Sequence, residues 1–66
     1  MNTPYPVRLD ISRYVFRHGH APRGAGIWCF EIAGNGLAVQ GTYSQAKAAA
    51  VRYARRIEAY TVTVLP

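Results

Sequence analysis

Apolar and polar residues alternate along several stretches of this chain, and the pattern predicts strands. Residues 7–18 interleave apolar with charged side chains, which indicates one strand or two short ones, because a period of two is typical of a half-buried strand. Residues 27–33 are rich in aromatic and β-branched side chains, and residues 37–40 follow as a short strand. Residues 60–65 alternate again. We therefore expect strands in these ranges.

A tight hairpin is expected between the second and third of these strands. Gly34-Asn35-Gly36 lies between them, and these residue types tolerate the positive φ angles that a short turn requires. In the strand before the turn, Trp28, Phe30 and Ile32 share one face. A tryptophan among apolar neighbours on a central strand is usually a core residue, so we expect this face to pack inwards.

One helix is expected between the third and the last strand. Ser44 has a hydroxyl suited to an N-cap, and a run of good helix formers follows it, so the helix is predicted from Gln45 to Glu58. Apolar residues within this range recur at the spacing of a single core-facing stripe. The stripe consists of Ala46, Ala49, Ala50, Tyr53, Ala54 and Ile57.

These elements give the order βββαβ and the fold class α+β. We expect a three- to four-stranded antiparallel sheet packed on one helix. A chain of 66 residues has room for a single domain with a thin core, predicted over residues 7–66. Residues 1–6 contain two prolines and no periodic pattern, which indicates a loose N-terminal arm.

Positive charge is the main functional signal of the sequence. Eight Lys and Arg oppose three Asp and Glu, and the net charge is +5. Arginine predominates among the cations, and its planar fork suits phosphates and carboxylates, so an anionic partner is expected. Alternatively, these cations form an ordinary solvent-exposed face that binds no partner. The candidate residues lie on the open face of the predicted sheet and on the solvent side of the helix: Arg13, Arg17, Lys47, Arg52, Arg55 and Arg56.

The sequence offers little material for catalysis or for a cofactor. His18, His20 and Cys29 resemble a set of metal ligands only weakly, because no carboxylate or second thiol has a usable spacing nearby. A thiol–imidazole pair would lack a third, orienting group. With three acidic residues in the chain, paired carboxylates for acid–base chemistry are not expected either. We expect no enzymatic activity, no metal and no cofactor.

The expected location is the cytoplasm. A single cysteine, Cys29, excludes an internal disulfide, and nothing else marks the chain as secreted. The first residues lack the basic and apolar regions of a signal peptide, and no stretch approaches the roughly 18 apolar residues that cross a bilayer. We therefore expect no membrane partner.

About half of the chain carries a set of spaced glycines, a strand tryptophan, a Gly-Thr-aromatic turn and helical alanines. The residues of this set are Arg23-Gly24, Gly26, Trp28, Glu31-Ile32, Gly41-Thr42-Tyr43, Ala46, Ala49-Ala50, Tyr53 and Ala54. In these residues the chain resembles the AP2-type DNA-binding domain and, more loosely, the arm-binding N-terminal domains of phage and transposon integrases. The resemblance implies a three-stranded antiparallel sheet on one helix, with Arg and Trp side chains of the sheet in the major groove, and it adds Arg23 to the candidate residues. The Arg-rich first strand of that family is missing here, and a strand is added after the helix.

These patterns favour a small DNA-binding accessory protein, of the kind that phages and mobile elements encode, which docks onto the phosphates of duplex DNA. The alternative is a small protein-binding inhibitor or adaptor, for example an anti-CRISPR or another anti-defence protein. Such a protein would use the same basic surface against an acidic or nucleic-acid-binding site of its target. An open strand edge, at the first or the last strand, is expected to allow a homodimer.

Overall fold

The computed structural model describes residues 6–66, and it confirms the α+β class. The sheet has four strands in the order β1-β4-β2-β3. The predicted loose arm lies outside the described residues except for Pro6. The elements along the chain are β1 (Arg8–Asp10), α1 (Ser12–His18), β2 (Ala25–Ile32), β3 (Asn35–Thr42), α2 (Tyr43–Arg56) and β4 (Thr61–Val64).

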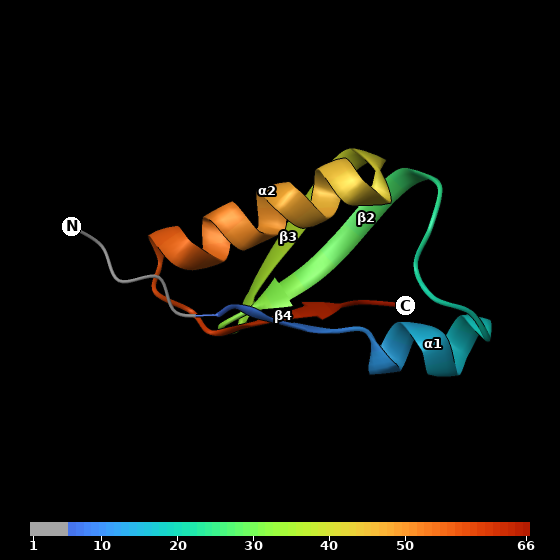
Figure 1. The fold of residues 1–66 in the computed structure, drawn as a ribbon, viewed down its shortest axis with the longest axis horizontal. Coiled ribbons are helices and arrows are strands. Elements are labelled where there is room, and N and C mark those ends of the chain that lie inside the picture. The colour runs from blue at the N-terminus through green and yellow to red at the C-terminus, as the bar shows by residue number, and fades with distance from the viewer. Residues whose placement is uncertain (1–5) are drawn as a thin grey trace.

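The two helices occupy different places relative to the sheet (Figure 1). The long helix α2 covers one face, where it packs on β2, β3 and β4. The short helix α1 lies on the other side of β4 from α2, at the end of the sheet where the chain terminates, and it contacts β4. The remainder of that second face is left open.

The sheet is mixed, which corrects the purely antiparallel sheet expected from the sequence. β2 pairs antiparallel with β3 and with β4, whereas β1 pairs parallel with β4, with Leu9 beside Val62. The last strand of the chain is therefore an inner strand that separates β1 from β2. Local patterns could not show this, because the pairing joins segments some fifty residues apart in the chain.

The prediction of strand structure over residues 7–18 is right only for Arg8–Asp10. Asp10 ends the strand, because its carboxylate accepts hydrogen bonds from the amide (3.0 Å) and the hydroxyl (2.7 Å) of Ser12. Residues 12–18 form α1, and Gly19 at φ 79° ends it by donating its N–H to the carbonyl of Val15. Phe16 is 93% exposed because the helix turns its side chain outwards.

The hairpin between β2 and β3 is tighter than predicted. Ile32 pairs with Asn35, so the turn consists of Ala33 and Gly34 instead of Gly34-Asn35-Gly36. Both turn residues have positive φ, 52° and 83°, as expected of a two-residue turn that matches the twist of its strands. The shorter turn lets β3 begin at Asn35, two residues earlier than predicted, and β3 becomes a strand of eight residues, whereas β2 ends at Ile32.

Helix α2 begins earlier than predicted, and its N-cap is Thr42 in place of Ser44. The hydroxyl of Thr42 accepts the N–H of Gln45 at 3.2 Å, and the side-chain oxygen of Gln45 accepts the N–H of Thr42 at 3.0 Å. This reciprocal capping box satisfies two backbone donors at once, which a cap at Ser44 would not do. The helix ends at Arg56, and Glu58 follows it with φ 60°.

The core lies between α2 and the sheet, as the sequence predicted. Trp28 is 7% exposed, and it packs against Tyr14 of α1 and Tyr43 of α2, with ring centroids 5.5 and 5.0 Å apart. The alanines of the predicted helical stripe allow α2 to approach the sheet closely. The fully buried residues are Phe30, Ile32, Ala46, Ala50, Ala54, Val62 and Val64.

The assignment of the N-cap is testable with a pair of single substitutions. Thr42→Ala removes the hydroxyl of the capping box and is expected to lower the free energy of unfolding by about 1 kcal/mol. Ser44→Ala removes a hydroxyl that forms no hydrogen bond within the described chain, and it is expected to change stability by less than about 0.5 kcal/mol. Urea denaturation followed by circular dichroism measures both. A larger loss for Ser44→Ala would contradict the assignment.

Tyr43 gives a second test, because its buried hydroxyl has no hydrogen-bond partner among the described residues. Burial also raises the pKa of this phenol above its ordinary value. Tyr43→Phe is therefore expected to leave stability unchanged or raise it by up to about 1 kcal/mol. Below about pH 10 the phenol is neutral in both the folded and the unfolded chain; above that pH the unfolded chain ionises first, so stability falls as the pH rises towards the raised pKa of the folded state. Denaturation curves between pH 8 and pH 11 should show a larger alkaline loss for the wild type, and equal losses would contradict this.

Candidate nucleic-acid interface

The outer face of α2 carries the largest group of candidate cations. Arg52, Arg55 and Arg56 are exposed and lie on the side of the helix opposite the buried Ala50 and Ala54, as the period of 3.6 requires. We call these three arginines the α2 arginine group. They are close neighbours, because Arg52 precedes the others by three and four residues, one turn of a helix.

Within residues 6–66, no ion pair engages the α2 arginine group. The sequence of α2 contains no Asp or Glu, and the ion pairing within residues 6–66 is limited to Arg13 and Glu31. Like charges one helical turn apart repel each other by a few tenths of a kcal/mol. An anion placed over this face would remove that repulsion and meet three guanidinium groups together.

Lys47 lies nearer the N-terminal end of α2 and is partly engaged. Its ammonium group is 5.8 Å from the centre of the Tyr43 ring, close enough for a cation–π contact. It lies more than a helical turn from Arg52 and belongs to the flank of the helix. Lys47 therefore lies on a different side of α2 from the arginine group and is not part of it.

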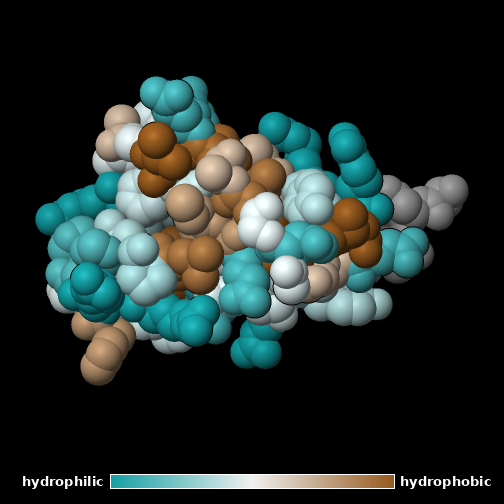
Figure 2. Space-filling view, turned by 180° about the vertical axis from the view of Figure 1, so that it is seen from behind, coloured by the Kyte–Doolittle hydropathy of each residue, from teal (hydrophilic) through white to brown (hydrophobic). Residues whose placement is uncertain are grey.

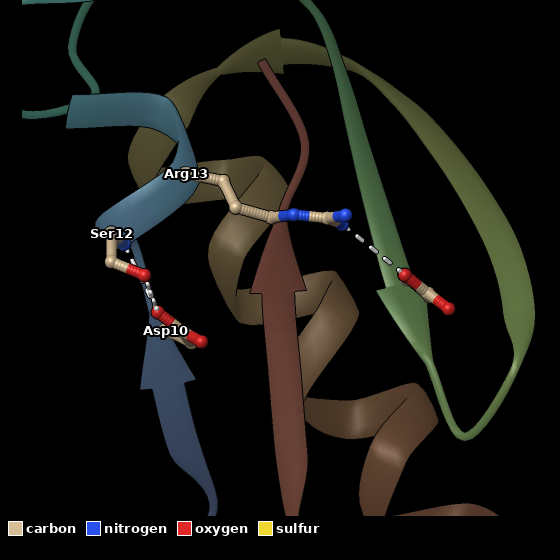
Figure 3. Close-up of polar contacts among 4 residues, drawn as sticks. Asp10, Ser12 and Arg13 are labelled. Atoms are coloured by element: carbon tan, nitrogen blue, oxygen red, sulfur yellow. Dashed lines mark hydrogen bonds and ion pairs between the residues drawn. The ribbon is translucent and has the colours of Figure 1, made fainter. Parts of the chain in front are cut away.

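Arg13 and Arg17 lie on α1, and the prediction that they stand on the open face of the sheet is wrong. Figure 3 shows the Arg13 side chain reaching across β4 towards Glu31 on β2, where the two groups are 3.6 Å apart. Both side chains remain about half exposed, 59% and 50%. A pair exposed to this degree contributes little to stability, but it lowers the positive charge available at Arg13.

The open face of the sheet is therefore not the basic surface that the sequence predicted. On β2 it presents Ile27, which is 70% exposed, together with Cys29 and Glu31. On the adjoining strands β3 and β4 it carries small or uncharged polar side chains, and Arg8 and Asp10 lie at its far edge on β1. This face lacks the row of arginines that contacts with phosphates would need.

Arg23 lies in the loop before β2, next to a group of packed aromatic rings. It lines an open pocket together with His18, Tyr14 and Trp28. The indole N–H of Trp28 donates to the carbonyl of Gly24 at 3.3 Å, and the ring is buried. Trp28 is thus a core residue here and is not exposed for contact with a base.

The two histidines pack on aromatic rings. His18 and His20 flank Tyr14, with centroid distances of 4.2 and 5.8 Å. In the part of the chain that the structure describes, no three His, Cys, Asp or Glu side chains lie together in a group able to hold a metal ion. Over the same residues, neither helix is both long and apolar enough to cross a membrane.

The chain matches no known family model, no curated protein and no solved structure in the comparisons that were made. The resemblance of residues 23–54 to the AP2-type domain therefore stays a prediction.

Sequence reasoning missed the helical position of Arg13 and Arg17, although a local signal for it exists. Ile11, Tyr14, Val15 and His18 follow one another at helical spacing, and they fit a helix as well as the neighbouring alternation fits a strand. Two residues favour the helix over the strand. The side chain of Asp10 ends the strand before residue 12, and Gly19 ends the helix after residue 18.

The two hydrogen bonds from Ser12 to the carboxylate of Asp10 predict that a substitution of Ser12 changes the pKa of Asp10. The side-chain hydrogen bond from Ser12, followed by its backbone hydrogen bond, lowers the pKa of Asp10 (Figure 3). The resulting stabilisation is present above the ordinary pKa and is lost as the pH falls through the lowered one. Ser12→Ala removes the larger contribution, so the pKa of Asp10 should rise towards its ordinary value in an NMR titration. Ser44→Ala is the matched control and should leave it unchanged; equal pKa values in all three proteins would contradict the assignment.

Proposed function

We propose that this protein is a small, non-enzymatic accessory protein that binds duplex DNA through the outer face of α2. The observation that carries the proposal is the α2 arginine group, which is exposed, free of ion pairs within residues 6–66 and held on one rigid helix. Guanidinium groups bind phosphate oxygens through paired hydrogen bonds, and phosphate contacts supply most of the affinity of basic proteins for nucleic acid.

The dimensions of α2 fit a duplex. Its 14 residues span about 21 Å, and the major groove of B-DNA, about 12 Å wide, admits an α-helix. Alternatively, the helix lies along the phosphates at the rim of the groove. In both arrangements Arg52 and Arg56, one turn apart, reach successive positions of a strand.

The duplex is favoured over single strands because α2 presents no stacking surface. Proteins that bind single strands generally stack the bases on exposed aromatic side chains. Tyr43 and Tyr53 are the aromatic residues of α2, and both are partly buried against the core. The arginines of α2 are therefore suited to a regular backbone of phosphates more than to unpaired bases.

An exposed aromatic residue on α1 supports a second candidate function, binding to an acidic protein surface as an inhibitor or adaptor. Phe16 is 93% exposed and lines a shallow apolar hollow with Arg13 and Arg17. An exposed aromatic side chain between arginines is a typical anchor of a protein interface. This candidate uses α1, whereas the binding of DNA uses α2.

Two matched triple variants test the proposal. Fluorescence anisotropy with a labelled random-sequence duplex would compare the wild type, R52Q/R55Q/R56Q and R13Q/R17Q/R23Q at two salt concentrations, with the fold of each checked by circular dichroism. Each phosphate contact contributes about 0.9 to the slope of log K against log salt. The α2 variant should bind more than about tenfold more weakly, with a slope lower by about two to three. The control removes the same charge from α1 and the loop, and should retain most of the binding.

Three results would contradict the proposal. One is the absence of wild-type binding at low salt, which would leave the protein partner as the function to test. Another is binding that does not depend on salt. The last is an equal loss in both triple variants, because net charge alone would then account for the affinity.

A further inference from the structure

The two edges of the sheet differ sharply in how well they are protected. The β1 edge has three residues, two of them the charged Arg8 and Asp10, and Pro6 stands just before it. The β3 edge is eight residues long and contains no charged residue and no proline. Charges, prolines and short length are the usual means of preventing an edge strand from pairing with another chain. β3 has none of these.

The backbone groups that face the open edge of β3 follow from the pairing of the strands. The carbonyl of Cys29 accepts the N–H of Leu65, which lies beyond β4, so the backbone of Cys29 points towards β4. Backbone direction alternates along a strand, so Trp28 and Phe30 direct their N–H and C=O groups to β3. Their partners are Val39 and Leu37. The residues between these partners therefore direct their backbone groups outwards.

The outward-facing backbone is concentrated at the centre of β3. Gly36, Ala38 and Gln40 point to the open edge, and no side chain of residues 6–66 covers them with a hydrogen bond. Thr42 also points outwards, but its N–H is already bound by the side chain of Gln45. The free part of the edge thus consists of Gly36, Ala38 and Gln40, with Ala38 in the middle.

We propose that β3 pairs with β3 of a second copy of this chain, in antiparallel orientation, with Ala38 on the two-fold axis. In this register Ala38 lies opposite Ala38 of the other copy, and Gly36 lies opposite Gln40. Each of these outward-facing residues then exchanges both its N–H and its C=O hydrogen bonds with the other copy. The capped Thr42 lies just outside the paired segment.

The same register matches the side chains on the face that α2 covers. Leu37 and Val39 point to this face and are only partly buried in the single chain. The two-fold axis places Leu37 of one copy opposite Val39 of the other, so apolar side chains meet and are removed from water. Figure 2, seen from the side on which β3 lies, shows hydrophobic atoms at the surface in the middle of this side of the molecule, with hydrophilic side chains around them.

A second copy fits this edge better than an unrelated strand, because the segment is complementary to itself. In the register centred on Ala38, the outward-facing backbone groups of both copies are hydrogen-bonded. Leu37 of each copy packs against Val39 of the other, and no charged side chain lies opposite another. At its N-terminal end, the side of α2 next to β3 is uncharged, where Gln45 approaches Gly41 and Thr42. Arg52 and Arg56 follow Ala49 by three and seven residues, so they lie further along the same side of the helix, exposed to solvent.

The proposed dimer has a consequence for the interface on α2. The two-fold axis of an antiparallel strand pair stands perpendicular to the sheet, so both α2 helices lie on the same side of one continuous sheet. Two α2 arginine groups would then face a partner together. The dimer does not depend on the proposed binding of DNA, and its test contains no nucleic acid.

Sedimentation equilibrium over a range of protein concentrations tests the dimer, with a reductant present because Cys29 is exposed. The wild type should show a monomer–dimer equilibrium. Ala38→Lys places two like charges opposite each other at the axis and should weaken the dimer by about fivefold or more. Ala48→Lys adds the same charge to the exposed side of α2, away from the edge, and should leave the dimer intact.

Gln40→Pro keeps the proposal testable if Ala38→Lys does not fold. The N–H of Gln40 points away from β2, so proline at this edge position leaves the ladder with β2 intact and removes a hydrogen bond of the dimer alone. Circular dichroism checks the fold of each variant. A wild type that stays monomeric at hundreds of micromolar would overturn the proposal, as would folded Ala38→Lys and Gln40→Pro variants that dimerise like the wild type.

Discussion

The insertion of β4 between β1 and β2 is the constraint on which the rest of the structure depends. Val62 and Val64 on this strand are fully buried, and they join the parallel pairing with β1 to the antiparallel pairing with β2. Because the last strand of the chain is an inner strand, the sheet is complete only when β4 pairs with both β1 and β2. The N-terminal strand is thus joined to the hairpin of β2 and β3 through a single short strand.

This strand order determines which surfaces are free to act. It leaves the uncharged strand β3 at one edge, and it protects the other edge with the short, charged strand β1. It also holds α1 at one end of the sheet. There Arg13 reaches across β4 and forms an ion pair with Glu31, one of the few acidic residues of the chain. The α2 arginine group is left as the concentrated positive surface of the described chain, on the face opposite the core.

The sequence predicted those features that depend on a local period. The core face of β2 and the alanine stripe of α2 follow directly from periods of two and 3.6, and so does the outward direction of Arg52, Arg55 and Arg56. The residues around Tyr14 fit both periods, so the pattern alone does not distinguish a strand from the helix α1 that forms there. The neighbours of β3 and β4 were not predictable, since strand order is decided by the packing of distant segments. The site on α2 was thus predictable, whereas the open edge was not.

The most direct test of the proposed interface is to map the contacts of a short duplex on the protein by NMR. The wild type would be titrated with the duplex while the backbone amides and the arginine Nε–H groups are followed. The account predicts the largest shifts at Arg52, Arg55 and Arg56 and in the adjoining amides of α2, with little change at Ile27 and Cys29 on the open face of the sheet. Shifts centred on that open face or on α1, with α2 unchanged, would contradict it.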